Sequence, residues 1–560
     1  MICIFRPNAL VDDPDLGRGR NWITDFLDAV VAATKRALFV LFVLLLLPPF
    51  SVQGNIYYVS TNGLNNAPYT NWTDASTSLQ SAIDQAQNGD TVFVSNGQYN
   101  VTSQVVVSRG VQVIGVGGST SAVINAQGMG RCFYLTHSNA LIQGFQITGG
   151  LDANGGGVYC VQGTVKQCLV FNNEAYTNGG GIWTAGQVLS CNVESNRAAT
   201  GGGIYTSTGS VSGCSVWGNT CSVRGAGIES IASTVANCNI YENQGGSGVW
   251  LSNTSELREC IIHDGPNGGV VITSSSRMKN CLVYRNTGSF GAGVYISGGS
   301  DIIIDHCTIT GNTGGTGAGI RSYTGGDVRN SIIISNNGPN ISIGYSPYPV
   351  FSLTCVTPWQ AGQGNITNPP GFVSLSTADY HLSSNSPCID QASDSSSLTN
   401  DLNMIPRPLD GNHDGIARSD IGCHEFVDAI SDSDNDLMPD GWELINGLSP
   451  IKATGNDGAT ADLDSDGVSN LGEYLADTNP TNAQSLLRIS ELSFESGGIK
   501  IDWSGGVQAM QFLEFKTTLL STSETWAVIY TNQAPTSTTN TYLFSDTTNG
   551  NHFYRIRARR

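Results

Sequence analysis

Charged residues are scarce in this sequence. They make up 13% of the 560 residues, and 45 Asp and Glu outnumber 26 Lys and Arg. A net charge of -19 with no basic stripe argues against nucleic acid as a partner, because nothing would neutralise the phosphates. Anionic polymers stay open as partners, since the acidic residues gather in one region: residues 428–477 hold twelve Asp and Glu against one Lys.

Long hydrophobic runs and catalytic motifs are also missing. The apolar run 37–47 has eleven residues, too few to cross a bilayer as an ordinary helix. The sequence contains no Cys-x-x-Cys cluster, zinc motif, phosphate loop or Ser-His-Asp order. No pectate lyase or polygalacturonase signature is present either, so a catalytic function has to be argued from clusters of single residues.

Residues 1–54 are expected to form a signal peptide or an N-terminal anchor. Lys35 and Arg36 precede the apolar run, and Val52 and Gly54 offer small residues for cleavage before Asn55. We therefore expect a secreted or cell-surface monomer, with membrane contact only through this anchor or through attachment to the cell envelope.

Glycine is abundant, with 68 residues, and most of it follows a pattern. One phrase recurs eight times: GGGVY (155–159), GGGIW (179–183), GGGIY (201–205), GAGIE (225–229), GSGVW (246–250), GGVVI (268–272), GAGVY (291–295) and GAGIR (317–321). The Val or Ile that closes each phrase recurs every 21 to 26 residues. Such a period without a helical pattern predicts a β-solenoid, in which the glycines turn a corner at positive φ.

A second phrase, V-x-x-C-x-V-x-x-N, runs in phase with the first. Its cysteines are Cys168, Cys191, Cys214, Cys238, Cys260, Cys281 and Cys307. One residue per coil rarely provides disulfide geometry, so a column of buried thiols is expected. Asn follows five residues after most of these cysteines, and Gly265 breaks the series. We expect the Asn side chains to stack by hydrogen bonds and to tolerate a left-handed corner.

These repeats resemble the right-handed parallel β-helix, or pectate-lyase-like, superfamily over roughly residues 55–350. The alternation of x-x-N with GG[GA][IV] is also similar to repeats of chlamydial polymorphic outer-membrane proteins. The stretch LQSAIDQAQNGDTVFVSNGQY (79–99) is similar to the cap helix and first strand of the superfamily, with Leu79, Ile83 and Ala86 covering the core. The resemblance implies the fold but no single function, because the fold hosts lyases, hydrolases, epimerases and adhesins.

The β-helix is expected to span residues 55–425, including a closing segment. SPCIDQASD (386–394) and MIPRPLDGNHDGIARSDIGCHEF (404–426) resemble a choice-of-anchor domain. Asp410, Asn412, Asp414 and Asp420 are spaced like oxygen ligands of calcium, with a solvated Asx-rich turn as the alternative. Whether Cys388 and Cys423 form a disulfide is left open.

Residues 427–484 contain two acidic loops that resemble thrombospondin type 3 or dockerin-like calcium repeats. The second loop would bind calcium through Asp462, Asp464, Asp466, the Val468 carbonyl, Asn470 and Glu473, with Gly467 at its sharp turn. The first keeps Asp432, Asp434, Asp436, Asp440 and Glu443 but has Leu437 at the glycine position. An acidic disordered linker is the alternative. Residues 485–560 alternate apolar and polar residues, which predicts a small β-sandwich.

Two rows of residues should point outward if the Val and Ile of each coil point inward. Their aromatic members suit either stacking on sugar rings or cross-strand packing, and those expected to bind sugar are Trp183, Tyr205, Trp217, Tyr241, Trp250, Tyr284 and Tyr295. Tyr159, Phe171 and Glu229 belong to the same outward rows. A polysaccharide lyase needs a base and a cation that neutralises a uronate carboxylate. The best cluster for these roles consists of Arg258, Lys279, His263 and Glu229, with Asp264 nearby. Solvated corner residues are the alternative interpretation of that cluster.

The sequence thus predicts an all-β protein: a right-handed parallel β-helix, a calcium-binding linker and a C-terminal β-sandwich. We expect it to bind polysaccharide or a cell-surface glycan on the outer face of the solenoid. Cleavage is left open; as an enzyme it would be a polysaccharide lyase or a glycoside hydrolase. The alternative is a non-catalytic adhesin or structural surface protein.

Overall fold

The computed structural model describes residues 54–299, 301–394, 398–519, 525–545 and 552–560. The expected signal peptide or anchor falls on residues 1–54 and therefore lies, apart from Gly54, outside the described residues. Within the described ranges, no helix has both the length and the apolar character that crossing a membrane would require.

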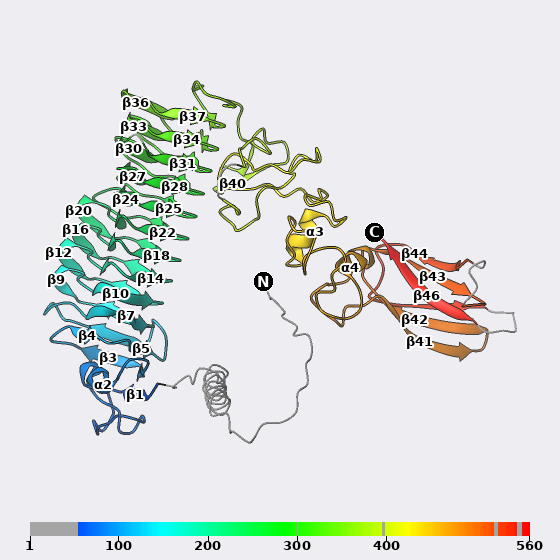
Figure 1. Ribbon diagram of the computed structural model, residues 1–560, viewed down its shortest axis with the longest axis horizontal. Coiled ribbons are helices and arrows are strands. Elements are labelled where there is room, and N and C mark those ends of the chain that lie inside the picture. Colours follow the sequence, from blue (N-terminus) through cyan, green and yellow to red (C-terminus); the bar gives the residue numbers. More distant parts are fainter. Residues whose placement is uncertain (1–53, 300, 395–397, 520–524, 546–551) are drawn as a thin grey trace, which may run out of the picture. The chain divides into compact units, whose positions relative to one another are not determined.

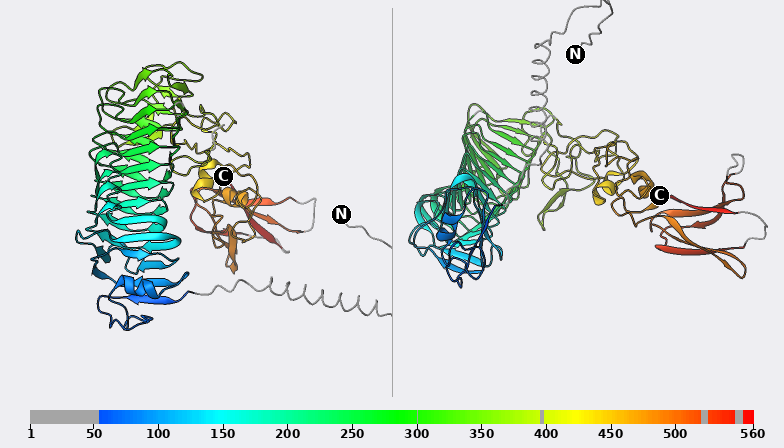
Figure 2. Two further views of the ribbon diagram at one scale, coloured as in Figure 1. Left: turned by 60° about the vertical axis from the view of Figure 1, so that its left-hand side comes forward. Right: turned by 60° about the horizontal axis from the view of Figure 1, so that its bottom comes forward.

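Parallel strands wind into a solenoid between Ile56 and Val356 (Figures 1 and 2). Neighbouring coils pair in register, for example Ile182 with Ile204 and Val188 with Val211. The expected parallel β-helix is confirmed. Each coil has three main faces, because one sheet contributes two strands per coil and a second sheet contributes one.

The first and second faces belong to a 22-stranded sheet. Its strands are β1 (Ile56–Val59), β2 (Thr91–Val94), β4 (Val105–Val107), β5 (Gln112–Gly115), β7 (Phe133–Gln143), β10 (Val158–Lys166), β13 (Ile182–Thr184), β14 (Gln187–Leu189), β17 (Ile204–Ser207), β18 (Ser210–Ser212), β21 (Ile228–Ile231), β22 (Thr234–Ala236), β24 (Val249–Ser252), β25 (Glu256–Arg258), β27 (Val270–Thr273), β28 (Arg277–Lys279), β30 (Val294–Gly298), β31 (Ile303–Asp305), β33 (Ile320–Thr324), β34 (Asp327–Arg329), β36 (Ile341–Tyr345) and β37 (Val350–Ser352). We call the face of β13 the first face and that of β14 the second.

The third face is a 12-stranded sheet. It consists of β3 (Gly97–Asn100), β6 (Ala122–Asn125), β8 (Gln146–Thr148), β11 (Leu169–Phe171), β15 (Asn192–Glu194), β19 (Ser215–Trp217), β23 (Asn239–Tyr241), β26 (Ile261–His263), β29 (Leu282–Tyr284), β32 (Thr308–Thr310), β35 (Ile332–Ile333) and β38 (Cys355–Val356). A short sheet of β9 (Leu151–Asn154), β12 (Glu174–Asn178), β16 (Arg197–Thr200) and β20 (Thr220–Arg224) lies between the third face and the glycine phrases.

Apolar columns fill the interior of the solenoid, one behind each face. The column behind the first face is Val158, Ile182, Ile204, Ile228, Val249, Val270, Val294 and Ile320, all fully or almost fully buried. These are the residues that close the glycine phrases, so the predicted inward register is confirmed. Helix α2 (Leu79–Gln85) closes the N-terminal end; Leu79, Ile83 and Ala86 are buried there, as expected.

The glycine phrases turn a corner, as the sequence predicted. The first glycine of a phrase has positive φ, 68° at Gly179 and 59° at Gly201. The third packs against the next coil, and a Cβ on Gly181 would lie 2.8 Å from the Gly203 carbonyl oxygen. A residue larger than glycine at this third position would therefore push neighbouring coils apart.

Stacked asparagines form the expected ladder. Asn196 donates its Nδ2 to the Val170 carbonyl and to Oδ1 of Asn219, and its own Oδ1 accepts from Nδ2 of Asn173 at 3.0 Å. One detail of the prediction was wrong, because the left-handed residue is the one before the asparagine, such as Ser195 with φ 55°. The asparagine side chain therefore satisfies buried backbone groups rather than turning the chain.

The column of buried thiols is also present. The thirteen described cysteines are all free and buried. The Cys168 amide donates to Sγ of Cys191 at 3.4 Å, and the Cys191 thiol donates to the Leu189 carbonyl oxygen at 3.4 Å. Cys388 and Cys423 are likewise free and pack in separate apolar clusters, so the open question of their disulfide is answered in the negative.

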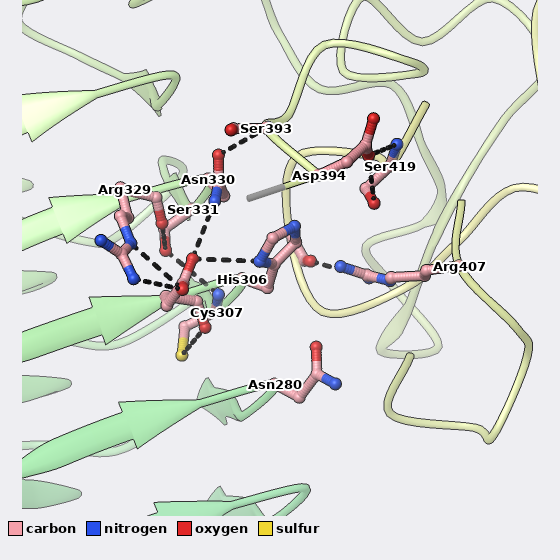
Figure 3. Close-up of polar contacts among 12 residues, drawn as sticks. Asn280, His306, Cys307, Arg329, Asn330, Ser331, Ser393, Asp394, Arg407 and Ser419 are labelled. Atoms are coloured by element: carbon pink, nitrogen blue, oxygen red, sulfur yellow. Dashed lines mark hydrogen bonds and ion pairs between the residues drawn. The ribbon is translucent and has the colours of Figure 1, made fainter. Parts of the chain in front are cut away.

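Residues 358–426, the closing segment, pack against the solenoid near its C-terminal end (Figure 3). Among the described residues of this segment, the only strands are those of the hairpin formed by β39 (Phe372–Ser374) and β40 (Asp379–Leu382). Asn330 joins the two parts, because its Nδ2 donates to Asp305 at 2.8 Å while its Oδ1 accepts from the Ser393 amide at 3.0 Å. The third face is thereby covered from Leu282 onward.

Two short helices and a β-sandwich follow. Helices α3 (Asp440–Ile445) and α4 (Asn470–Ala476) end the two acidic loops. One sheet of the sandwich contains β41 (Arg488–Glu495), β42 (Gly498–Ser504) and β45 (Thr539–Phe544); the other contains β43 (Met510–Lys516), β44 (Ala527–Asn532) and β46 (Phe553–Arg559). Ile501, Trp503 and Leu513 form its buried core, as expected for a small sandwich.

Candidate functional site

Aromatic rings line the first face as a stacked row. The Tyr159 ring lies between those of Tyr134 and Trp183, at centroid distances of 5.6 and 4.5 Å, and Trp183 stacks on Tyr205 at 6.2 Å. The rings therefore pack largely on one another along the axis. Their edges and hydroxyl tips, rather than their faces, are what this row offers to a ligand.

The row of stacked rings is interrupted beyond Tyr205. The next outward residue is Glu229, followed by Trp250, Val271 and Tyr295 in parallel register. Val271 is 8% exposed and separates Trp250 from Tyr295. The predicted sugar-binding residues of this face thus fall into one continuous group of rings and two isolated ones.

A groove of about 410 Å³ lies at the corner where the first face passes into the second. Ala185 and Gly186, on its wall, are two and three residues after Trp183 in the chain. The lining is uncharged and mostly polar: Ser138, Gln162, Gly163, Thr164, Ala185, Gly186, Gln187, Thr208, Gly209 and Ser210. Corresponding residues recur on consecutive coils, so amide and hydroxyl groups repeat along the solenoid axis.

Two arginines flank the aromatic row. Arg131 forms an ion pair with Asp152 at 2.6 Å and lies over the Tyr159 ring at 4.7 Å. Arg224 binds Glu229 at 2.7 Å and lies over Trp250 at 5.5 Å. The cation–π contacts and ion pairs fix both guanidinium groups beside the rings.

Glu229 is fully buried, although the sequence placed it among the outward residues. Burial raises the pKa of its carboxyl group, and the Arg224 hydrogen bond opposes that shift only in part. Its Oε2 has no hydrogen-bond partner among the described residues. Glu229 therefore positions Arg224 and cannot itself reach a ligand on the surface.

A second row of rings lies on the third face. Trp217, Tyr241, His263 and Tyr284 stack with centroids 5.0 to 5.8 Å apart and interplanar angles of 4 to 15°. Tyr380 of the closing segment packs on Tyr284 at 5.2 Å and ends the row. The ring faces are again used within the row, which is the cross-strand packing alternative raised by the sequence.

The predicted catalytic residues are dispersed and engaged with other groups. Arg258 and Lys279 are register partners, as expected, but Arg258 pairs with Glu259 at 2.6 Å and Lys279 with Glu256 at 3.3 Å. They lie on the second face, whereas His263 lies on the third and Glu229 on the first.

His263 has both ring nitrogens occupied. Nδ1 contacts Asp264 at 2.6 Å, and Nε2 contacts Oδ1 of Asn239 at 3.1 Å. Asp264 in turn accepts two hydrogen bonds from Arg285. These contacts lower the pKa of Asp264 against the opposing effect of its burial. The His263 cluster is thus a closed ion-pair network on a stacked ring, with no base directed at a ligand.

The two acidic loops share one backbone geometry. Asp462 accepts hydrogen bonds from the amides of Asp466 and Gly467, at 3.0 and 2.8 Å. Asp432 does the same with Asp436 and Leu437, at the same two distances. Leu437 has φ 78° and is 70% exposed, so it occupies the glycine position at the cost of backbone strain. In both loops, the first aspartate therefore holds the same turn by accepting from two backbone amides.

Carboxylates converge inside both loops. One oxygen from each of Asp432, Asp434 and Asp436 lies within 4.8 Å of the others, and Asp462, Asp464 and Asp466 form a matching group. Glu443 and Glu473 are fully buried beside these groups. Neither carboxylate oxygen of either glutamate has a hydrogen-bond partner in the described part of the chain.

Burial and mutual repulsion both act on these carboxylates. Burial and the neighbouring aspartates raise the pKa of Glu443 to about 9 and that of Glu473 to about 7. Asn470 is also buried, and its Oδ1 has no hydrogen-bond partner among the residues that the structure describes, while its Nδ2 donates to backbone carbonyls. Buried oxygens without donors fit a hard divalent cation such as calcium.

Not every predicted ligand has a free oxygen. Asp440 uses both carboxylate oxygens to accept from the Ser433 amide and hydroxyl, at 2.8 and 2.6 Å. Asp420 accepts from the amides of Asp390 and Phe426. These two carboxylates already have donors within the chain.

The predicted third site, around Asp410, folds into a similar turn. Asp410 accepts from the amides of Asp414 and Gly415, and the Asn412 oxygen also accepts from Asp414. Asp414, however, forms an ion pair with Arg418 at 3.1 Å. Asp410 is 4% exposed, and calcium at this third turn stays a prediction.

The sequence pattern did not reveal several residues of the two aromatic rows and the groove. Tyr134 continues the first row, Arg131 lies over it, and Tyr380 ends the second row. Tyr134 precedes the first glycine phrase, and Tyr380 lies 96 positions after Tyr284 in the chain. Only the groove left a usable signal, because Gly163, Gly186 and Gly209 recur every 23 residues.

Comparison with known proteins supports the architecture. A family model described as a right handed beta helix region matches residues 131–288 and 247–357. This description supplies the hand of the solenoid, and the prediction of a right-handed parallel β-helix is confirmed. No curated protein matches the chain.

Solved structures with a similar fold are distant. Pectate lyase Pel9A is 15% identical, with a TM-score of 0.40 over 66% of this chain and 96% of that chain. The Dettilon tailspike protein gp208 is 15% identical, with a TM-score of 0.40 over 56% and 69%. A rhamnogalacturonan lyase is 13% identical, with a TM-score of 0.36 over 57% and 91%. Likeness at this level carries no argument about activity.

Proposed function

We propose that this chain is a secreted or cell-surface protein that binds a polysaccharide along the outside of its β-helix. The observation that carries the proposal is the uncharged groove beside the aromatic row of the first face. Sugars present hydroxyl groups that both donate and accept hydrogen bonds. The amides of Gln162 and Gln187 and the hydroxyls of Thr208 and Ser210 supply both kinds of partner.

The repeat of the groove supports a polymeric ligand. Neighbouring coils are about 4.8 Å apart, and each brings a similar set of polar groups to the same corner. A chain of repeating units laid along the axis would meet equivalent contacts at each coil. The ring edges of Tyr159, Trp183 and Tyr205 border this path and add apolar contact and hydroxyl groups.

Binding rather than cleavage is the activity that the contacts support. Glu229 is buried, and Arg258, Lys279 and His263 are held in ion pairs or hydrogen bonds away from the groove. A general base has to reach the proton that it removes. The ionisable groups proposed from the sequence do not meet that requirement in these positions.

We further propose that the two acidic loops bind calcium. Asp434, Glu443, Asp464 and Glu473 carry buried carboxylate oxygens without partners, and Asn470 and the Val468 carbonyl would complete the second site. When bound, the cation would neutralise carboxylates that otherwise repel one another. The proposal supports a structural role for the cation in the linker between the β-helix and the sandwich.

A glycan array probed with the full chain tests the binding proposal. Trp183→Ala and Gln187→Ala are expected to lower affinity for the bound glycans at least ten-fold, because they remove a ring edge and an amide from the same path. Tyr348→Ala is the matched control, since Tyr348 is 65% exposed and lies outside the groove and both rows. Undiminished binding by both groove variants would contradict the proposal. If the full chain bound no glycan on the array, a structural protein that does not bind glycans would be favoured.

A further inference from the structure

A second groove, larger than the first, lies nearer the N-terminal end. It has a volume of about 700 Å³ and follows the corner between the second and third faces. Its lining comes from five consecutive coils and includes Phe93, Ile114–Val116, Gln143, Gln167, Ser190 and Asn192. Four steps between coils give a length of about 19 Å, enough for several units of a linear ligand.

One end of this groove has an apolar wall. Phe93 and Ile114 are register partners on the second face, and Val116, which is 50% exposed, follows on the same strand end. The Tyr58 ring packs on the Phe93 ring with a centroid distance of 6.2 Å, and the Trp72 ring packs on Tyr58 at 4.6 Å. Trp72 is 43% exposed, so the wall continues into an open aromatic surface.

The other end carries amides and hydroxyls. Gln143 donates from Nε2 to Oε1 of Gln167 at 2.9 Å, which aligns the two amides across neighbouring coils. Ser190 and Asn192 follow on the next coil. The floor is open because Gly115 and Gly144 stack closely, with a Cβ on Gly115 only 2.4 Å from the Gly144 carbonyl oxygen.

No charged side chain lines this groove in the part of the chain that the structure describes. The nearest cation in the same register is Lys166, the partner of Gln143 on the following strand, and it lies outside the lining. In a chain with a net charge of -19, all twelve residues that line this groove are uncharged, as are the ten that line the first groove. Apolar contact together with paired donors and acceptors, without charge, is the chemistry of a neutral saccharide.

We propose that this second groove binds a chain of uncharged sugars, with apolar sugar faces against Phe93 and Val116 and hydroxyl groups on the amides of Gln143 and Gln167. The proposal rests on the proposed glycan binding and adds a separate site to it. The ligand class is also narrower, because uronates and sulfated sugars would bring negative charge to a groove that offers no countercharge.

Calorimetric titration of the full chain tests this with neutral hexasaccharides of glucose, xylose and mannose, and with hexagalacturonate. Binding of at least one neutral hexasaccharide is expected. Val116→Asp should abolish it and Gln143→Ala should weaken it at least ten-fold. Val223→Asp is the matched control for the first variant, because Val223 is exposed to a similar extent on the short sheet. Gln363→Ala is the control for the second variant, because Gln363 is exposed and lies outside both grooves.

Four outcomes would overturn the inference. Neutral sugars that bind equally to Val116→Asp and to the parent chain would exclude this groove. Tight binding of hexagalacturonate that Lys166→Ala abolishes would make the ligand acidic. Capture of an extended peptide in place of any sugar would change the ligand class. Absence of binding to every hexasaccharide would refute the proposed second site. Sugar binding in the first groove is tested separately, by the array results for Trp183→Ala.

Discussion

Gly181 leaves no space for a side chain, because a Cβ at that position would lie 2.9 Å from Nδ2 of Asn196. The glycine phrase and the asparagine ladder therefore support each other across one corner of the coil. Each asparagine needs a glycine beside it, and each glycine is held in place by the stacked amides.

Replacement of Gly181 by alanine should lower the free energy of unfolding by about 1–3 kcal/mol, the usual cost of overpacking a tight interior. The Cβ would also approach the Gly203 carbonyl oxygen to 2.8 Å. Gly315→Ala is the control, because a Cβ there meets no atom within 4 Å. Equal denaturation midpoints for the two variants would refute this account of the phrase.

Removal of one rung of the ladder should be costly as well. Asn196→Ala would leave the Asn173 amide, the Val170 carbonyl and the Asn219 side chain without their partner. We expect a loss of about 1–3 kcal/mol in urea denaturation, the penalty for unpaired buried polar groups. Asn192→Ala, on the exposed side of β15, should cost far less; a comparable loss there would argue against the ladder.

Acid should destabilise the junction between the solenoid and the closing segment. Burial lowers the pKa of His306 to about 4, although Asp305 holds it by a hydrogen bond; Arg329 and Arg407 oppose its charge. A histidine in the unfolded chain has a pKa near 6.5. Between pH 6.5 and 4, the unfolded chain therefore binds a proton at this position that the folded chain does not bind. The stability present above pH 6.5 should fall by about 3 kcal/mol as the pH drops to 4.

The variant His306→Asn isolates this effect, because asparagine tolerates the left-handed backbone found at this position. Other groups titrate in the same range, so the measurement is the difference between the two stability curves. That difference should change between pH 6.5 and 4 and stay constant above pH 7. A flat difference throughout would show that His306 is not the sensitive group.

Calcium removal should act on the two acidic loops. Chelation is expected to lower the melting temperature and to expose residues 427–484 to proteases. Glu473→Gln should weaken calcium binding at least ten-fold while stabilising the chain in chelator, since it removes a buried charge close to Asp464 and Asp466. The exposed Glu495→Gln should change neither value. If Glu473→Gln lowered stability equally with and without calcium, the glutamate would have a purely structural role.

The buried thiols should be unreactive in the folded chain. Burial raises the pKa of Cys132 to about 12 and that of Cys160 to about 11, so neither forms the reactive thiolate near neutral pH. In a Cys3→Ser background, which removes the cysteine outside the described residues, a thiol reagent should react only after denaturation. Rapid reaction of Cys388 or Cys423 in the native chain would contradict their burial.

The parts of the fold that repeat were predictable from the sequence, and the parts that occur once were not. The periodic Val and Ile residues revealed the inward columns, because register within a coil is a local property. The burial of Glu229 depends on Arg224 reaching around a corner, and the end of the ring row at Tyr284 depends on Tyr380 of the closing segment. Contacts of this kind leave no periodic signal.

The candidate binding surfaces show the same division. Alternation placed Trp183 and Tyr241 correctly on the outside, but it could not show that the rings would stack on each other. It also gave no reason to pair Phe93 with Gln143, since their groove forms only when five coils are assembled. The turns of the two acidic loops were predictable, because each loop spans only twelve consecutive residues, and calcium binding by these loops stays a prediction.

The three corners repeat in every coil, so one coil is the segment that can be duplicated or lost as a unit. Duplication or loss of one segment of 21 to 26 residues would leave the ladder, the thiol column and the glycine corner intact on either side of the change. Each such event would lengthen or shorten the grooves by one step. Recombination alone, without any new point mutation, would therefore change the length of the grooves that we propose to bind a polymer.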